Sequence, residues 1–268
     1  MKQVTVSLIV PVYNGERWLD GCMKSIFNQS FSDFEVIVIN DGSTDGSLEI
    51  LKKWEKREKR LLLISTENRG VSAARNLGIS QAGGKYIRFL DCDDTMPSAA
   101  LTELVKAAEL SDTELVIAPF YEVTGTVFTP RTLIENETLL TRDEYLSGMK
   151  RYPRSFFYSV LWNKLYRRDV MIQKNIRFDE KLSWSEDFLF NVHYLSGVHH
   201  VACLEKPVYD YHHHSSGLTL RFSRTVIFHP FKTIPLFRRL LAEYTANCLN
   251  GKGELKDYLA FFKQTHGI

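Results

Sequence analysis

The chain has 268 residues, with 34 Lys and Arg against 32 Asp and Glu and a formal net charge of +2. It is 44% hydrophobic, 12% aromatic and 25% charged, which excludes a disordered, collagen-like or low-complexity chain. The near balance of charge gives no general electrostatic reason to expect nucleic acid as a partner. The length suggests one large domain or two smaller ones.

The cysteines and the N-terminus indicate the compartment. The 4 cysteines are scattered, with neither a CxxC pair nor a metal-binding spacing, so a reducing cytosol is the better expectation. The N-terminus runs directly into a strand-like segment without the features of a signal peptide. No window approaches the ~18 uninterrupted apolar residues of a spanning helix. We expect a cytoplasmic protein, at most peripheral at the inner face of a membrane.

Two hydrophobic periods alternate over residues 1–120. Apolar and β-branched runs predict strands at residues 4–10, 35–40, 61–64, 85–90 and 115–118. Helical spacing predicts helices at 16–29, 48–54, 71–82 and 101–108, with Ser43 or Thr44 as the cap of the second. This alternation predicts a doubly wound, mostly parallel α/β sheet, in which ligands bind at the carboxyl ends of the strands.

The pattern changes after residue 120. Residues 121–141 are typical of loops and short strands, and the segment that follows, to about residue 220, is rich in aromatic residues and paired charges. From there to the end the pattern is helical but interrupted by prolines. We therefore divide the chain into an α/β region at 1–120, a region at 121–220 that packs directly on it, and a helical tail at 221–268.

Polar residues follow three of the predicted strands. The first strand leads into residues 11–16, the second into 40–46 and the fourth into residues 91–94 (DCDD). Three carboxylates in four residues repel one another unless a cation offsets the repulsion. Such oxygen ligands suit Mg²⁺ or Mn²⁺ held jointly with a substrate diphosphate. An acidic loop that caps the next helix is the competing interpretation.

The glycine-rich turn at residues 42–46 (GSTDG) excludes little but disfavours two classes of enzyme. It is not GxGxxG and no P-loop lysine follows it, which disfavours a dinucleotide dehydrogenase and a P-loop kinase. Asp41 precedes this turn at the end of a predicted strand. Its side chain could bind a base or ribose, or only shape the turn.

Four segments together resemble glycosyltransferase family 2. They are residues 10–14 (VPVYN), 40–45 (NDGSTD), 68–76 (NRGVSAARN) and 89–94 (FLDCDD). Their order and spacing are similar to those of the family's GT-A fold, and the set is far more specific than any single segment. The resemblance covers residues 4–220 and is stronger before residue 100 than after it.

The resemblance implies a nucleotide-sugar donor, and a uridine diphosphate sugar is favoured because the family often uses one. Pro11, Tyr13 and Glu16 would then line the base and ribose pocket. Asp41 would contact the base, and Asp91 would face the ribose. These five residues form the expected pocket for the nucleoside.

The resemblance also implies contacts to the diphosphate and to a divalent cation, Mn²⁺ or Mg²⁺. Arg75 resembles the basic residue near the pyrophosphate, and Asp93 would hold the cation in the DxD motif. Residues 209–216 (YDYHHHSS) resemble a late segment whose basic residue meets the diphosphate or metal; His214 is our candidate, followed by His212. Neighbours on an extended chain point to alternate faces, so the three histidines cannot share one zinc ion. A surface histidine cluster is nearly as good an interpretation.

A pair of acids in residues 184–190 (WSEDFLF) looks like the family's Glu-Asp motif at a helix start. An inverting transfer needs a carboxylate that takes the acceptor hydroxyl proton during attack on the anomeric carbon. We expect Asp187 to be that base and Glu186 to position the acceptor or Asp187. Without the other motifs, acids favoured by the helix dipole would be the simpler interpretation. Trp162 is as good a candidate for the core as for acceptor contact.

Basic and aromatic residues mix in the tail between 221 and 241, which suits a membrane interface and a lipid-linked acceptor. Packing of this segment on the main domain is the stronger expectation. The predicted partners are therefore a nucleotide-sugar donor and a saccharide or lipid-linked saccharide acceptor, with no nucleic acid. The oligomeric state, the donor sugar and the linkage stay open.

The sequence thus predicts a cytoplasmic, metal-dependent, inverting hexosyl- or N-acetylhexosaminyltransferase of cell-surface polysaccharide or glycoconjugate synthesis. A sugar nucleotidyltransferase is one alternative, but its glycine- and lysine-rich nucleotide loop is missing. A catalytically silent nucleotide-sugar-binding subunit is the other. The intact acidic sets at 91–94 and 186–187 argue against it.

Overall fold

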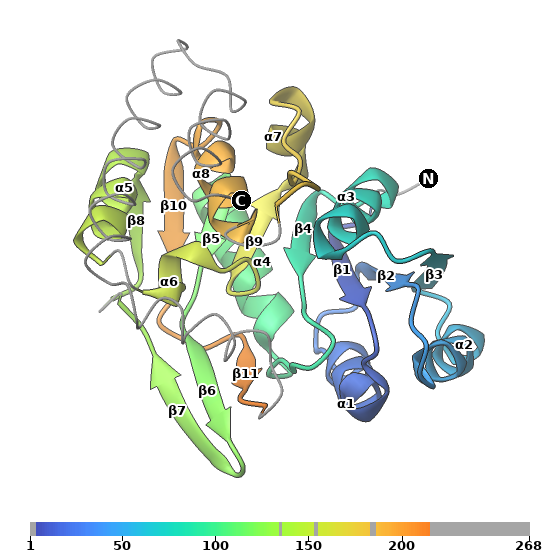
Figure 1. Ribbon diagram of the computed structural model, residues 1–268. Coiled ribbons are helices and arrows are strands. Elements are labelled where there is room, and N and C mark those ends of the chain that lie inside the picture. Colours follow the sequence, from blue (N-terminus) through green and yellow to red (C-terminus); the bar gives the residue numbers. More distant parts are fainter. Residues whose placement is uncertain (1–3, 134–135, 153–154, 183–185, 215–268) are drawn as a thin grey trace, which may run out of the picture.

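The computed structural model describes residues 4–133, 136–152, 155–182 and 186–214 (Figure 1). The strands of this part of the chain are β1 (Val6–Val12), β2 (Phe34–Asp41), β3 (Leu61–Thr66), β4 (Tyr86–Phe89), β5 (Leu115–Ile117), β6 (Phe120–Thr124), β7 (Val127–Arg131), β8 (Thr138–Thr141), β9 (Lys164–Arg167), β10 (His200–Cys203) and β11 (Asp210–His212). The helices are α1 (Glu16–Phe27), α2 (Ser47–Arg57), α3 (Val71–Gln81), α4 (Ala100–Ser111), α5 (Arg142–Arg151), α6 (Phe156–Ser159), α7 (Arg168–Gln173) and α8 (Glu186–Leu195). The predicted tail at 221–268, with its membrane hypothesis, lies outside these residues.

The main sheet has eight strands in the order β3-β2-β1-β4-β9-β5-β10-β8, and a second sheet has the order β11-β6-β7. β1 runs parallel to both β2 and β4, and β2 runs parallel to β3. All of β1 is buried, as the continuous apolar run of a strand covered on both faces requires. α1 and α2 contact each other and α3 packs on β1 and β2; right-handed crossovers imply that α3 covers the other face of the sheet. The predicted mostly parallel α/β sheet is confirmed.

Two local predictions are wrong. The first strand does not end at residue 10, before Pro11, but continues to Val12, because β1 pairs with β4 only as far as Ile9 and the missing N–H of Pro11 costs no ladder bond. Neither Ser43 nor Thr44 caps the second helix, since α2 begins at Ser47 after Gly46. The polar atoms of both residues instead bond with Asn14 in the loop after β1.

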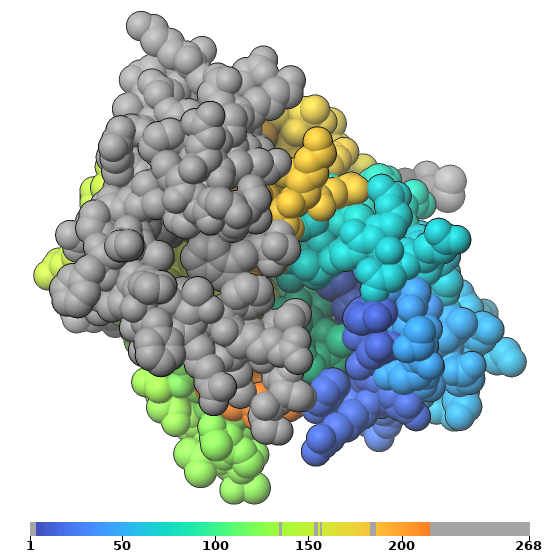
Figure 2. Space-filling model, in the orientation of Figure 1, coloured from blue at the N-terminus to red at the C-terminus, as the bar shows by residue number. Residues whose placement is uncertain are grey.

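The second region contributes strands to the same sheet as the first. β9 lies between β4 and β5 and runs antiparallel to both. β10 runs parallel to β5, and β8 closes the edge antiparallel to β10. The hairpin of β6 and β7 projects from the body of the molecule, as Figure 2 also shows. The described residues of the first region, from residue 4 to 120, and those of the second, from 121 to 214, therefore share one sheet and one continuous core.

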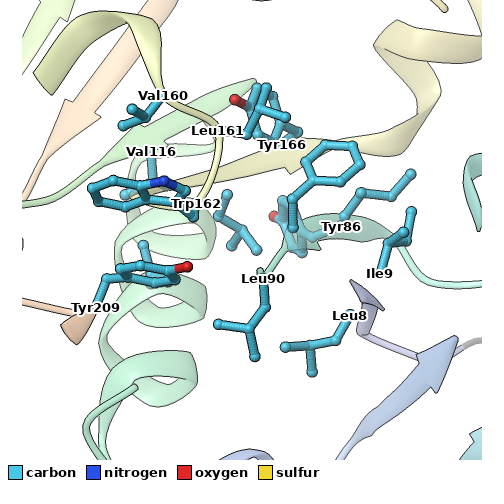
Figure 3. Close-up of a cluster of buried hydrophobic side chains, with 14 of the residues drawn as sticks. Leu8, Ile9, Tyr86, Leu90, Val116, Val160, Leu161, Trp162, Tyr166 and Tyr209 are labelled. Carbon is cyan, nitrogen blue, oxygen red and sulfur yellow. The ribbon is translucent and has the colours of Figure 1, made fainter. Parts of the chain in front are cut away.

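An aromatic stack joins this core to β11. Trp162 is 5% exposed, and its ring lies 4.3 Å from that of Tyr209 and 5.5 Å from that of Tyr211, nearly parallel to both. Figure 3 shows Trp162 above Tyr209, with Val116 and Leu90 beside them. Of the two roles considered for Trp162, the structure shows the core role. No described helix has the length and apolar character to cross a bilayer.

Candidate active site

The loops that follow β1 and β2 are bonded to each other at the carboxyl ends of the strands. The Asn14 side chain accepts a hydrogen bond from Thr44 N at 2.8 Å, and Gly15 N donates to Ser47 Oγ at 2.9 Å. Asn14 adopts a left-handed conformation, with φ of 52°. Gly42 has φ of 69°, and a side chain there would collide with the backbone of Asn68. The first three motifs are thus packed against one another at one edge of the sheet.

The expected nucleoside-binding residues occupy different positions at this edge. Tyr13 is 52% exposed, and Glu16 accepts a hydrogen bond from Gly46 N at 2.9 Å. Pro11, in contrast, is buried within β1 beside Ile39 of β2. Tyr13 and Glu16 are therefore available at the surface of the edge, while Pro11 shapes the strand beneath them.

Asp41 is 3% exposed, and its side chain binds backbone N–H groups. Its two carboxylate oxygens accept hydrogen bonds from Arg69 N at 2.8 Å and Gly70 N at 2.9 Å. These contacts hold the turn that precedes α3, and Gly70 adopts φ of 89° within it. Asp41 therefore stabilises the turn before α3, and not the turn at residues 42–46 that the sequence suggested.

Asp94 anchors the acidic segment to β11. It is 1% exposed, and its carboxylate accepts hydrogen bonds from Tyr209 Oη and His212 N, each at 2.7 Å. Burial raises the pKa of Asp94 well above its ordinary value, and the charges of Asp93 and Asp91 add to this effect. Asp94 is therefore a structural member of the acidic set, directed inward.

Asp93 and His214 meet on the other side of the same segment. His214 Nε2 lies 3.0 Å from the carbonyl oxygen of Asp93, and the His214 ring packs 4.7 Å from Trp18 of α1. Burial raises the pKa of the Asp93 carboxyl, and Asp91 raises it further. The His212 ring is nearly parallel to that of His214 but bonds to Thr95 Oγ1 at 2.9 Å. Of the two histidines, His214 is the one directed at the acidic segment.

The described residues contain no group of three His, Cys, Asp or Glu side chains arranged to hold a metal by themselves. A carboxylate whose pKa is raised by burial and a neighbouring acid is nevertheless a group that a divalent cation would stabilise in its charged form. Mg²⁺ and Mn²⁺ are commonly held by one or two protein ligands together with substrate phosphates. The Asp93 carboxylate suits such a partial site, and His214 lies beside it through its contact with the Asp93 carbonyl oxygen.

Arg75 lies between the two acidic sets. Its guanidinium is 5% exposed and contacts Asp187 Oδ1 at 2.8 Å, Asp91 Oδ1 at 3.2 Å and Glu186 Oε1 at 3.6 Å. These contacts join α3, the end of β4 and the first turn of α8. The resemblance placed Arg75 near the pyrophosphate, whereas here three carboxylates surround a buried cation and balance its charge.

Asp187 has an environment suited to proton transfer. Burial raises its pKa to about 7, against the lowering effect of Arg75; Glu186 and Asp91 raise it further and Lys164 lowers it. Its side chain keeps 24% of its surface exposed, and that of Glu186 keeps 19%. Asp187 is therefore both reachable from solvent and balanced between its charged and neutral forms near neutral pH.

The structure brings together Asp91, Arg75, Glu186 and Asp187, and separately Asp93 with His214. The sequence did not identify Trp18 as the support of His214 or Tyr209 as the anchor of Asp94. Trp18 lies in the helix predicted at residues 16–29, where helical spacing places it only on the apolar face. Its position in the first turn after a strand end was the one signal that it lies near the site.

Comparison with solved structures defines the class of fold. A structure of TarS 1-349 from S. aureus in complex with UDP-GlcNAc is similar with a TM-score of 0.70 and 23% identity, over 94% of this chain and 77% of that TarS 1-349 chain. A mannosyltransferase from Pyrobaculum calidifontis in complex with GDP-Man and Mn²⁺ has a TM-score of 0.61 and 16% identity, over 100% of this chain and 81% of the other. The fold is that of the GT-A glycosyltransferases.

Sequence comparison gives the family. The profile described as Glycosyl transferase family 2 matches residues 7–173. The uncharacterized glycosyltransferase EpsJ of Bacillus subtilis is 36% identical over 216 residues, which are 80% of this chain and 62% of EpsJ. The chain belongs to glycosyl transferase family 2, and it spans about six-tenths of the length of this relative.

Proposed function

We propose that the protein is an inverting glycosyltransferase in which Asp187 is the general base. The observation that carries this proposal is the contact of Asp187 with Arg75, which also holds Asp91 at the end of β4. The acceptor oxygen attacks the anomeric carbon, its proton passes to the Asp187 carboxylate, and the bond from that carbon to the diphosphate breaks. Glu186, beside Asp187, is proposed to position the acceptor.

The proposed donor is a nucleotide sugar, most simply a UDP-sugar, bound by Tyr13, Glu16 and Asp91. The proposal is supported by the UDP-GlcNAc and GDP-Man complexes of proteins with the same fold. Asp93 and His214 would hold Mn²⁺ or Mg²⁺, which would offset charge on the leaving diphosphate. The proposed acceptor is a saccharide or lipid-linked saccharide on the cytoplasmic side of a membrane.

Donor and metal binding can be tested together by thermal unfolding. We expect UDP with Mn²⁺ to raise Tm by about 5 °C or more when the free ligand is about 100 times its Kd, because only the folded protein binds it. UDP with EDTA should have a much smaller effect, and GDP serves as the comparison base. If neither UDP nor GDP raises Tm, the proposed class of donor is wrong.

Replacing Asp93 by asparagine should weaken the apparent affinity for Mn²⁺ by at least about tenfold, because the cation loses a charged oxygen ligand. Asp112→Asn is the matched control, since the Asp112 side chain is 86% exposed and pairs with Arg167. Mn²⁺ dependence of donor hydrolysis is the measurement. Full activity in excess EDTA would remove the metal from the proposal.

The pH dependence of kcat should report the ionisation of Asp187. A base must be deprotonated, and the pKa of Asp187 is raised to about 7, so kcat should increase with pH through this region. Well below it, kcat should fall by about tenfold per pH unit. The measurement is kcat at saturating donor and Mn²⁺ between pH 5 and about 9. A flat profile across this range would exclude Asp187 as the base.

A further inference from the structure

A buried lysine lies beneath the proposed base. Lys164 of β9 is 0% exposed, and its Nζ contacts Val160 O, Asn163 Oδ1 at 2.9 Å and Phe157 O at 3.4 Å. The Asn163 amide nitrogen donates to Phe157 O and Ala118 O, which leaves its oxygen as an acceptor toward Lys164. All three atoms around Nζ are therefore acceptors.

Three acceptors require three N–H donors, and only the ammonium form of lysine has them. A neutral amine would direct its lone pair at one of these oxygens. Burial lowers the pKa of Lys164 well below its ordinary value, and the nearby Asp187 carboxylate offsets only part of this effect. The hydrogen bonds thus favour a charged Lys164, and the carboxylate that compensates this charge is that of the proposed base.

Shared contacts place Lys164 on the side of β9 that faces Asp187. Asn191, one helical turn after Asp187 on α8, donates to Val160 O at 3.3 Å, the same carbonyl that accepts from Lys164. Tyr166, two residues after Lys164 and so on the same face of β9, donates to Asn191 Oδ1 at 2.7 Å. The face of β9 that carries Lys164 and Tyr166 therefore lies against the face of α8 that carries Asp187 and Asn191.

We propose that Lys164 is a positioning residue whose fixed positive charge, held by three backbone and amide oxygens, keeps the Asp187 carboxylate ionised for catalysis. This inference rests on the proposed function and extends it. The charged and titratable groups that face Asp187 are Arg75 of α3, Asp91 after β4, Glu186 of α8, and Lys164 and Tyr166 of β9. Arg75 acts by direct contact, and Lys164 acts through space.

A purely structural role is the alternative, because Lys164 also binds the backbone carbonyls at the end of α6. Asn191→Leu is the matched control: it removes donors to Ser159 O and Val160 O and the acceptor of the Tyr166 hydroxyl, but no charge. Lys164→Gln removes the charge and keeps an amide donor, and Lys164→Met removes both. Only the two Lys164 variants should alter the ionisation of Asp187.

The experiment is a carbon-13 NMR titration of the full chain labelled at the aspartate carboxyl carbon, with Asp187→Asn to assign the signal. We expect both Lys164 variants to raise the titration midpoint of Asp187 by about one pH unit, and Asn191→Leu to leave it unchanged. An unchanged midpoint in the Lys164 variants, or an equal shift in Asn191→Leu, would overturn the proposal.

Two further measurements keep the result decisive. In the wild-type protein, the Lys164 side-chain nitrogen should show the ammonium form at the pH where Asp187 is ionised, and a neutral amine there would overturn the proposal even if no Lys164 variant folds. Turnover of Asp187→Asn is measured in parallel. If that variant stays active, the proposed base is wrong, whereas the titration still shows whether Lys164 controls the charge of Asp187.

Discussion

Replacing Asp187 by asparagine is expected to lower kcat for sugar transfer by about 10²–10⁴-fold, the usual contribution of a general base. The amide is similar in size and keeps one oxygen that can accept from Arg75, but it cannot take a proton from the acceptor hydroxyl. Donor affinity should change little, because Asp187 is proposed to act on the acceptor. The measurement is steady-state transfer together with the thermal shift by UDP and Mn²⁺.

Asp143→Asn is the control for this loss of activity. Asp143 also lies in the first turn of a helix, α5, but its side chain is 79% exposed and lies outside the proposed site. It should retain full kcat. Unimpaired turnover of Asp187→Asn would remove Asp187 from catalysis, while loss of both turnover and donor binding would indicate a collapsed site.

Replacing Arg75 by methionine is expected to lower the free energy of unfolding by about 3–5 kcal/mol, the usual cost of breaking a buried ion pair. The 5% exposed guanidinium is the cation shared by Asp91, Glu186 and Asp187. Without it, these carboxylates repel one another in a partly buried space. Chemical denaturation near pH 8 is the measurement, because the carboxylates are then charged. Activity should be lost as well.

Arg69→Met is the matched control on the neighbouring turn. Arg69 pairs with Glu180 at 3.0 Å, but its side chain is 68% exposed, so the change in the free energy of unfolding should stay within about 1 kcal/mol. Arg75→Lys keeps the charge and loses the planar fork, and should fall between the two methionine variants. Equal effects of Arg75→Met and Arg69→Met would show that the central cation does not hold the site together.

Much of the N-terminal half could be predicted from local patterns. The continuous apolar runs of β1 and β2 and the helical spacing of α1 and α3 are properties of neighbouring residues, and they imply a parallel sheet with its ligand edge at the strand ends. Asp91 and Asp93 follow β4 directly, so their place at that edge follows from the same pattern. The continuation of β1 through Pro11 could not be predicted, because it depends on where β1 stops pairing with β4. A local sequence pattern holds no information on that pairing.

The pairing of distant acids and cations required the folded chain. Arg75 and Asp187 are 112 positions apart, and their contact joins α3 to α8 beside a sheet in which β9 lies between β4 and β5. Lys164 lies on this inserted strand. Local periodicity specifies which face of an element is buried, but the partner on that face depends on strand order. The sequence therefore determined the fold class and the acidic strand ends, whereas the network around Asp187 arose from long-range packing.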